Sequence, residues 1–288
     1  MSSSDSGAER RSAVDFLRQL AASLAAGTVD LPAFPGVVIR VREILKNPNF
    51  TVQMLAKPIS GDPTLAARLL NMANSTAFNA TGRVIIDLGV ALTRLGTQKV
   101  YSVVLAHAIQ DLRKSEALRT IGRPLDELWT ESVAVAHFCD AIAKRVKLST
   151  ADAFGAGLLH RIGHLYILVQ SVERGPSRPR VVVGNDLIEK AQPVIGKGIL
   201  KNWRMSDAIC EAVGAQADVL AVRSGPLTLT EILIASIRMA RRMRNPHDTS
   251  SLTSGGLLLR LNLSMDECNS LIANAEPDVR ALERVLHP

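Results

Sequence analysis

Two histidines, His160 and His164, lie four residues apart in the apolar stretch "AGLLHRIGHLYIL", which runs from Ala156 to Leu168. If this stretch forms one helix, both side chains lie on one face, one turn apart. Helical zinc sites begin with this spacing, and "HRIGH" differs from the metalloprotease pattern H-E-x-x-H by an arginine in place of the glutamate. The stretch is therefore a candidate metal centre, the remnant of one, or a helix that contains two histidines.

The residue between the histidines decides among these interpretations. The guanidinium of Arg161 stays protonated near neutral pH, so it cannot bind a metal cation and would repel one. No third ligand is visible nearby. We therefore favour a structural role, with one of the two histidines partly buried and hydrogen-bonded inside a helical bundle and the other on its surface.

A second candidate site is the arginine cluster in "SIRMARRMRNPH". On a helix, the first three of these guanidinium groups would share one face and could grip phosphates or an acidic partner. The alternative is a solvated face with cations near a helix C-terminus, which the helix dipole favours. We prefer this alternative, because no aromatic residues that could stack on bases are interleaved with the cluster. The cluster consists of Arg238, Arg241, Arg242 and Arg244.

The composition places few limits on function. Of the 288 residues, 47% are hydrophobic and 21% are charged, as in ordinary globular proteins, and the net charge of +7 allows an acidic partner without identifying one. The cysteines Cys139, Cys210 and Cys268 form no C-x-x-C pair, which predicts a reducing cytoplasm. The polar N-terminus is no secretory signal, and no apolar stretch is long enough to cross a membrane.

The elements that must position these residues are helices. Capping residues predict helix starts at Thr51, Asp62 and Asp87, and Gly96 ends the third of these helices. Further helical patterns cover residues 126–146, 151–170, 185–200, 206–217, 228–244 and 265–286, whereas "RVVVG" near 180–184 is interpreted as a loop. We predict an all-α protein with a disordered tail at residues 1–11 and an N-terminal helix at 12–30. Asn71, Asn74 and Ser75 are expected to close the helix after Asp62 and fix its turn.

Several ordered segments resemble the HDOD domain of bacterial signalling proteins. They are "LPAFPGVVIRVREIL", "ISGDPTLAARLLNMANSTAF", "DLGVALTRLGTQKV", "ELWTESVAVA", "FGAGLLHRIGHL" and, less closely, "VIGKGILKNW". The resemblance implies a multi-helix HD-like bundle, an HDOD domain at residues 31–223, followed by a helical C-terminal extension at 224–288. It also implies a non-catalytic relative of the HD phosphohydrolases.

In the catalytic relatives, a histidine, an adjacent His-Asp pair and a later aspartate hold a divalent metal that activates water. The resemblance places Glu131 of "WTES" at the first histidine and His160-Arg161 at the doublet. Gln192 stands where a further histidine often precedes "VIG". Only His160 survives as a ligand, and Glu131 with His160 makes a poor divalent site. A loosely aligned His-His pair corresponds to Ala215-Gln216.

The complementary change of charge suggests that a Glu131–Arg161 pair replaces the metal as the link between helices. The resemblance therefore implies a non-enzymatic, cytoplasmic bacterial signal-transduction protein without a cofactor, which binds a protein partner or a small ligand. Two alternatives are a residual metal-dependent phosphohydrolase that uses Glu131 and His160, and a regulator that binds nucleic acid or a cyclic dinucleotide. The oligomeric state, the signal and the partner stay open.

Overall fold

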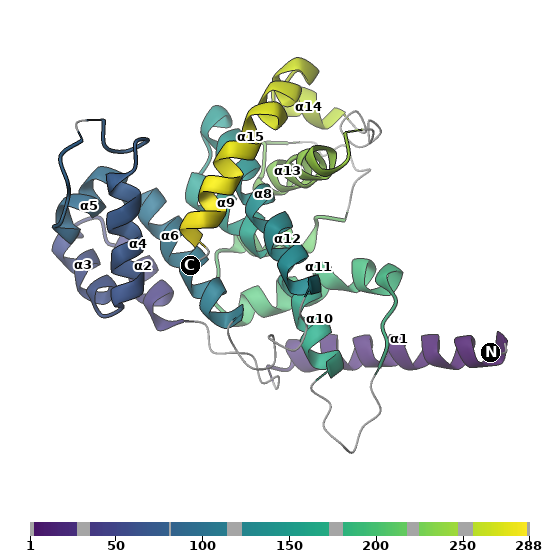
Figure 1. Ribbon diagram of the computed structural model, residues 1–288. Helices are drawn as coiled ribbons and strands as arrows, with labels where there is room; N and C mark the ends of the chain where they lie inside the picture. The colour runs from purple at the N-terminus through teal and green to yellow at the C-terminus, as the bar shows by residue number, and fades with distance from the viewer. Residues whose placement is uncertain are drawn as a thin grey trace. The chain divides into compact units, whose positions relative to one another are not determined.

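The structure is a computed structural model and describes residues 3–27, 35–80, 82–113, 123–172, 181–217, 225–246 and 256–286. In these ranges every regular element is a helix and no strand occurs (Figure 1). The predicted all-α class is therefore confirmed. Among the described helices, none has both the length and the apolar character needed to span a bilayer.

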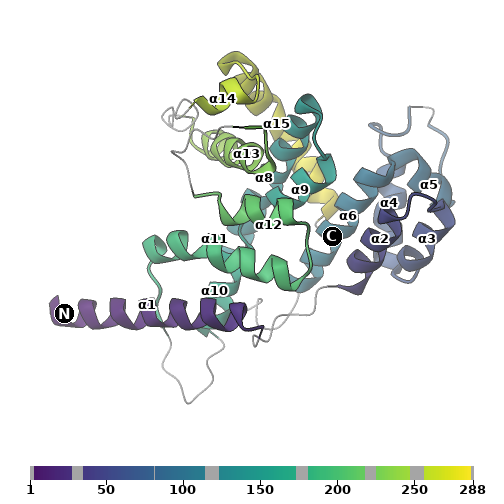
Figure 2. The ribbon, with the colours of Figure 1, turned by 180° about the vertical axis from the view of Figure 1, so that it is seen from behind.

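The chain forms two compact units. The larger unit comprises Met1–Leu31 with Ser115–Val279, and the smaller unit comprises Pro32–Lys114 with Arg280–Pro288. This division differs from the predicted one, because the predicted 31–223 domain is divided between the two units, and helices before and after it belong to the larger unit. The physical reason is packing. Helix α1 (Ser3–Ala25) packs on α11 (Asn185–Asn202), which can be followed in Figure 2.

The smaller unit is built from helices whose starts follow the capping pattern. The side chains of Thr51, Asp62 and Asp87 accept backbone N–H groups of the first turns of α3, α4 and α5. Gly96 ends α5 with a φ of 76°, a conformation that glycine adopts without strain. The helices are α2 (Gly36–Lys46), α3 (Val52–Ser60), α4 (Pro63–Asn74), α5 (Leu88–Leu95) and α6 (Thr97–Arg113).

The larger unit is organised around α13, most of which is buried, and which packs on α8, α9 and α12. The N-terminus of α13 is closed by a capping box, in which the buried Glu231 carboxylate accepts from the backbone N–H of Thr228 at 2.7 Å. Besides α1 and α11, the helices are α8 (Arg123–Val146), α9 (Thr150–Leu159), α10 (Ile162–Val172), α12 (Asp207–Gly214), α13 (Leu229–Arg244), α14 (Leu257–Arg260) and α15 (Met265–Leu286), of which α15 belongs to this unit only up to Val279.

The N-terminal helix is longer than expected. It begins at Ser3, whereas the sequence predicted a disordered tail up to residue 11 and a helix from about Ser12. The charged residues that suggested a tail are also good helix formers. The guanidinium of Arg10 donates to the Asp186 carboxylate at the start of α11, at 2.7 Å, so this end of the helix has a tertiary contact.

The stretch that contains the two histidines is not one helix. Helix α9 ends at Leu159, His160 caps it, and α10 begins at Ile162. The prediction of one helix over residues 151–170 was therefore wrong. The two halves have different neighbours, since α9 packs on α8 and α10 packs on α11. The apolar residues continue through the turn, so their pattern does not reveal this change of direction.

Candidate functional site

Glu131 and Arg161 form the centre of a buried polar network in the larger unit. Arg161 donates to one carboxylate oxygen of Glu131 from Nη2 at 2.9 Å and from Nε at 3.2 Å. Both side chains are about one-tenth exposed or less. Arg161 lies in the turn between α9 and α10, and Glu131 lies on α8, so the pair joins the turn to that helix. The predicted Glu131–Arg161 link is present.

Two further residues extend the network. The Nη1 of Arg161 donates to both carboxylate oxygens of Glu189 on α11, at 2.7 and 2.9 Å. The second oxygen of Glu131 accepts from Nη2 of Arg244, near the end of α13, at 3.1 Å. Two carboxylates and two guanidinium groups therefore alternate across α8, α11, α13 and the turn after α9. Their formal charges sum to zero.

His160 is fully enclosed beside this network. Its Nδ1 lies 2.7 Å from the carbonyl oxygen of Gly157, and because a carbonyl can only accept, Nδ1 carries a hydrogen. Its Nε2 is 3.7 Å from Glu131 Oε1, longer than a hydrogen bond. Gln216 donates from Nε2 to the His160 carbonyl at 2.9 Å. Gln216, which the loose alignment placed at a ligand position, thus lies next to the surviving histidine.

The other predicted site residues, His164 and Gln192, lie near the network, but their side chains share no partner among the described residues. His164 is only 16% exposed and 3.9 Å from Glu189, and His160 is 1% exposed, so neither histidine lies on the surface, contrary to the expectation for one of them. Gln192 on α11 is buried, and its Oε1 has no hydrogen-bond partner among the described residues. The backbone of Gln192 packs directly against Gly163, where an added Cβ would come within 2.0 Å of the Gln192 carbonyl oxygen.

The electrostatics of the network favour the charged carboxylate and the neutral histidines. Burial would raise the pKa of Glu131, but the positive charge of Arg161 and the hydrogen bond from Arg244 bring this pKa well below its usual value. Burial lowers the pKa of His160 more than Glu131 raises it. Burial, followed by the positive charge of Arg161, also lowers the pKa of His164. Near neutral pH the network is therefore an ionised Glu–Arg system beside two neutral imidazoles.

The residues present do not fit the divalent metal of an HD phosphohydrolase. The guanidinium of Arg161 takes up the Glu131 oxygen that faces His160, and Arg244 takes up the other oxygen. A cation placed between His160 and Glu131 would lie against Arg161, so the two ligands that survive are blocked by a positive charge.

The arginine cluster is divided between different environments. Arg238 is 4% exposed, whereas Arg241 is exposed, so these two side chains do not share a solvent-facing surface. Arg242 donates to the Met265 sulfur at 3.6 Å, and Arg244 reaches Glu131. Of the four arginines, Arg238 is the buried one, while the Arg244 side chain is 60% exposed although it reaches Glu131. Binding of phosphate by the cluster stays a prediction.

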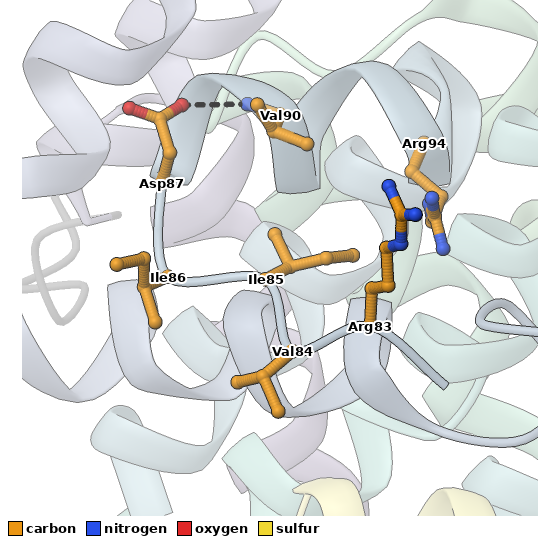
Figure 3. Close-up of a pocket in the computed structure, with 7 residues that line it drawn as sticks. All are labelled: Arg83, Val84, Ile85, Ile86, Asp87, Val90 and Arg94. Carbon is orange, nitrogen blue, oxygen red and sulfur yellow. Dashed lines mark hydrogen bonds between the residues drawn. The ribbon is translucent and has the colours of Figure 1, made fainter. Parts of the chain in front are cut away.

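The smaller unit has a hollow that the sequence did not indicate. It is lined by residues of the segment before α5 and of α5 itself (Figure 3). Two of these residues, Val84 and Ile86, are among the most exposed aliphatic side chains of the described chain. The periodicity of the sequence gave no signal, because the segment is too short to show alternation.

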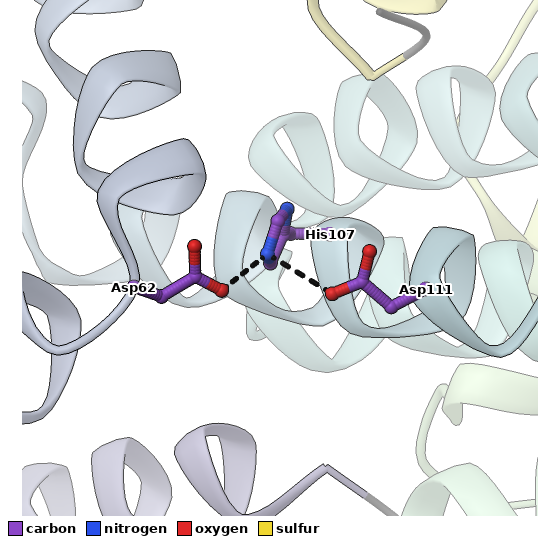
Figure 4. Close-up of side chains that lie close together, drawn as sticks. All are labelled: Asp62, His107 and Asp111. Atoms are coloured by element: carbon purple, nitrogen blue, oxygen red, sulfur yellow. Dashed lines mark hydrogen bonds and ion pairs between the residues drawn. The ribbon is translucent and has the colours of Figure 1, made fainter. Parts of the chain in front are cut away.

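The smaller unit also brings together Asp62, His107 and Asp111, whose ligand atoms lie within 4.8 Å of one another (Figure 4). The buried His107 Nε2 is 2.7 Å from Asp62 and 3.2 Å from Asp111. These are hydrogen-bond distances, and Asp62 also caps α4. Burial lowers the pKa of Arg68, and Asp111 and Asp62 oppose this shift, so a guanidinium already offsets their charge. We interpret the cluster as a polar link between α4 and α6.

Comparison with known proteins gives distant relatives of the same fold. The chain is 21% identical over 206 residues to an uncharacterised protein of Treponema pallidum (strain Nichols), covering 68% of this chain but only 39% of that protein. A crystal structure from Shewanella amazonensis SB2B, provisionally named a metal-dependent phosphohydrolase, has a TM-score of 0.68 and 22% identity. That alignment covers 95% of this chain and 98% of the other.

A second solved structure, provisionally named a signal transduction protein, comes from Marinobacter aquaeolei VT8. It has a TM-score of 0.65 and 20% identity over 97% of this chain and 66% of the other. Both similarities establish the fold alone. The family model described as the HDOD domain matches residues 31–219, well over half of the chain. The chain belongs to the HDOD domain family.

Proposed function

We propose that this protein is a non-enzymatic regulatory protein of bacterial signal transduction, which binds a partner protein or a small ligand through a degenerate HD-type domain. The position of Arg161 is the observation that supports this most directly. Its guanidinium lies between the carboxylates of Glu131 and Glu189, where a catalytic relative would need a carboxylate toward a metal. A site whose remaining ligands are occupied by guanidinium groups does not bind the metal that activates water in the catalytic relatives.

The rest of the network agrees with a structural role for the former site. Four charges of alternating sign join α8, α11 and α13, and His160 is held by backbone groups. We place the protein in the cytoplasm, since its three cysteines are buried and unpaired. Its work would consist of binding, as is thought for other members of the family.

Metal analysis and an activity assay test the absence of catalysis. The protein is purified without chelators, and its Mn, Fe, Ni and Zn contents are measured for the wild type and for His160→Ala. Hydrolysis of bis(p-nitrophenyl) phosphate is assayed with each metal added. We expect no stoichiometric metal that depends on His160 and no hydrolysis that His160→Ala abolishes. A stoichiometric metal lost in that variant, together with such hydrolysis, would establish the phosphohydrolase alternative.

Partner binding is tested separately by cross-linking and affinity purification from the native organism, with cell fractionation to locate the protein. We expect one cytoplasmic partner to be recovered with the folded chain and not with a heat-denatured sample. Recovery of nucleic acid alone, in an amount that falls in the double variant Arg241→Glu, Arg242→Glu, would instead favour the nucleic-acid alternative.

A further inference from the structure

The segment Arg83–Asp87 presents exposed aliphatic side chains on the smaller unit. Val84 is 79% exposed and Ile86 is 85% exposed, and Val90 of α5 is 51% exposed on the same hollow. Single exposed aliphatic residues are common, but three around one hollow form a patch, and such patches mark interaction sites. We call Arg83–Asp87 with Val90 and Arg94 the 83–94 surface (Figure 3).

The backbone of this segment is held as the edge of a sheet would be. The side chain of Asn74 accepts from the Ile85 N–H and donates to the Ile85 carbonyl, both at 2.8 Å. An adjacent strand would make the same pair of bonds to one residue. Asn79 donates to the Arg83 carbonyl at 2.8 Å, and the Ile85 side chain is buried. The segment is therefore fixed before any partner arrives.

One side of this fixed segment is unused. The side chains of Val84 and Ile86 lie opposite that of Ile85, the alternation of an extended chain (Figure 3). In such a chain the N–H and C=O groups of successive residues point to opposite sides, so those of Val84 and Ile86 point away from Asn74. Neither residue forms a backbone hydrogen bond outside the helices within the described part of the chain. Two residues spaced by two thus offer donors and acceptors along one edge, beside two exposed apolar side chains.

The charge around the edge is positive. Arg83 and Arg94 lie on the same side of the segment as Ile85, opposite Val84 and Ile86 (Figure 3). Arg94 donates to the Asn79 side chain at 2.7 Å, which fixes its guanidinium beside the hollow. The Asp87 carboxylate accepts from the Val90 N–H at the start of α5, so the helix dipole offsets its charge.

We propose that the 83–94 surface binds an extended segment of a partner protein in which apolar and acidic residues alternate. The segment pairs with the backbone of Val84 and Ile86 as an added strand. Its apolar side chains pack on Val84 and Ile86, and its carboxylates, on the opposite face of the strand, approach Arg83 and Arg94. Apolar and acidic residues must alternate in the segment because the 83–94 surface presents Val84 and Ile86 on one face and Arg83 and Arg94 on the other (Figure 3).

The inference rests on the proposed function, because a regulatory binding protein needs a partner surface, but it concerns the smaller unit and not the Glu131–Arg161 network. Its test is therefore independent of metal content and hydrolysis. The full chain is immobilised and used to select from a display library of short random peptides. The dissociation constant of a selected, fluorescently labelled peptide is then measured by anisotropy.

We expect the selected peptides to alternate apolar residues with Asp or Glu. The double variant Val84→Asp, Ile86→Asp should weaken their binding at least about tenfold. The two new carboxylates replace the apolar contact and also repel an acidic peptide. Arg83→Glu should also weaken binding, and added salt should reduce the difference. The matched control is Val182→Asp, Leu259→Asp, whose parent side chains are 77% and 84% exposed in the larger unit. It should bind as the wild type does.

Hydrogen exchange locates the bound peptide. We expect the peptide to slow exchange of the Val84 and Ile86 amides more than that of the Val182 amide. Circular dichroism checks that each variant is folded, which is expected because the altered side chains are exposed. The proposal is overturned if no alternating acidic peptides are selected, if the 84/86 variant binds them with unchanged affinity, or if protection appears elsewhere. Selection of basic peptides, or binding only to polyanions such as DNA, also overturns it.

Discussion

Arg161 donates two hydrogen bonds, from Nε and Nη2, to a single carboxylate oxygen of Glu131, and its Nη1 donates to both carboxylate oxygens of Glu189. The family resemblance assigns a metal ligand to each of the positions 131 and 161. At these positions the cation that pairs with Glu131 is therefore the guanidinium of Arg161, a side chain of the protein itself. It cannot exchange or activate water, and it neutralises the same carboxylate in every molecule.

The first prediction concerns the stability that this arrangement provides. Arg161→Met removes the buried cation and leaves Glu131, which is 8% exposed, with only the largely exposed Arg244 as partner. Removal of one partner from a buried pair costs about 3–5 kcal/mol of the free energy of unfolding. Arg244→Met should cost about 0–1 kcal/mol, because its side chain is 60% exposed. Urea unfolding monitored by circular dichroism measures both values.

A double variant provides the control for this prediction. Glu131→Leu combined with Arg161→Met removes both buried charges and should recover part of the loss. The charge swap Glu131→Arg, Arg161→Glu should not recover it, since the new arginine would face Arg244 and the new glutamate would face Glu189. If Arg161→Met unfolds at the wild-type urea concentration, the network does not stabilise the fold.

A second prediction tests whether Arg161 is the residue that excludes metal. Arg161→Asp places a carboxylate beside His160, Glu131 and Glu189 and removes the repelling charge. We expect Mn²⁺ or Zn²⁺ to raise the melting temperature of this variant and not that of the wild type. Arg161→Asn, which removes the cation without adding an anion, should respond less. An equal response of Arg161→Asp and wild type would contradict the proposed role.

A third prediction follows from the lowered pKa values of His160 and His164. In the unfolded chain these imidazoles take up protons near their usual pKa of 6.5, but in the folded chain they do so only at lower pH. The unfolded state therefore binds more protons just below that pH, and the free energy of unfolding should fall as the pH is lowered from about 7.5 to about 5.5. Glu131 contributes little in this window, because its stabilisation is lost only below its ordinary pKa of 4.5, as the pH falls from that value through the lowered pKa of the folded state.

His160→Asn is the variant that isolates this effect. Asparagine can retain the donor to the Gly157 carbonyl but cannot be protonated in this range. We expect its free energy of unfolding to depend less on pH over the same window than that of the wild type. Identical pH dependence of the two proteins, measured by urea unfolding at each pH, would show that His160 does not titrate with folding.

Much of the fold could be predicted because it is encoded locally. Thr51, Asp62 and Asp87 are residue types that cap helices, and each side chain accepts a hydrogen bond from a backbone N–H of the first turn, as expected. The Glu131–Arg161 link could be inferred because two changes of opposite charge fell on positions that the family brings together. By contrast, Glu189 and Arg244 complete the network from helices distant in sequence, and no local pattern marks them as partners.

The errors have a common physical origin. The break at His160–Arg161 and the burial of His164 depend on which helices α9 and α10 pack against, and the apolar pattern runs through the turn unchanged. The hollow at the 83–94 surface depends on Asn74, eleven residues before Ile85. The sequence predicted that Asn74 closes its own helix, and its side chain does donate to the Leu70 carbonyl there. Its two bonds to Ile85 require the segment before α5 to be folded against it, which no local pattern indicates.

A fourth prediction concerns the glycine in "HRIGH". A Cβ at Gly163 would lie 2.0 Å from the Gln192 carbonyl oxygen, so Gly163→Ala must separate α10 from α11. We expect a loss of about 1–3 kcal/mol or more in the free energy of unfolding. Gly36→Ala is the matched control, since its Cβ would meet nothing closer than 3.9 Å, and alanine favours the helix. Equal stability of the two variants would contradict the close approach of α10 and α11.

The last prediction connects the conformation of the 83–94 surface to Asn74. Its side chain forms both backbone hydrogen bonds of Ile85, and no other described residue bonds to those two groups. Asn74→Ala leaves them without partners, which should cost about 1–3 kcal/mol and loosen the segment. We expect the Ile85 amide to exchange faster in this variant. Peptides selected on the wild type should bind more weakly, although Val84 and Ile86 are unchanged, because the edge is no longer fixed in advance.

Ser75→Ala is the control for this variant. Ser75 donates to the Met72 carbonyl at the same helix end, at 2.7 Å, but does not contact Ile85. Its loss should therefore leave both the Ile85 exchange rate and peptide binding close to the wild-type values. Faster Ile85 exchange with unchanged peptide affinity in Asn74→Ala would mean that the partner itself orders the segment. Unchanged exchange would mean that Asn74 does not hold it, because an amide that keeps its protection has kept a hydrogen bond.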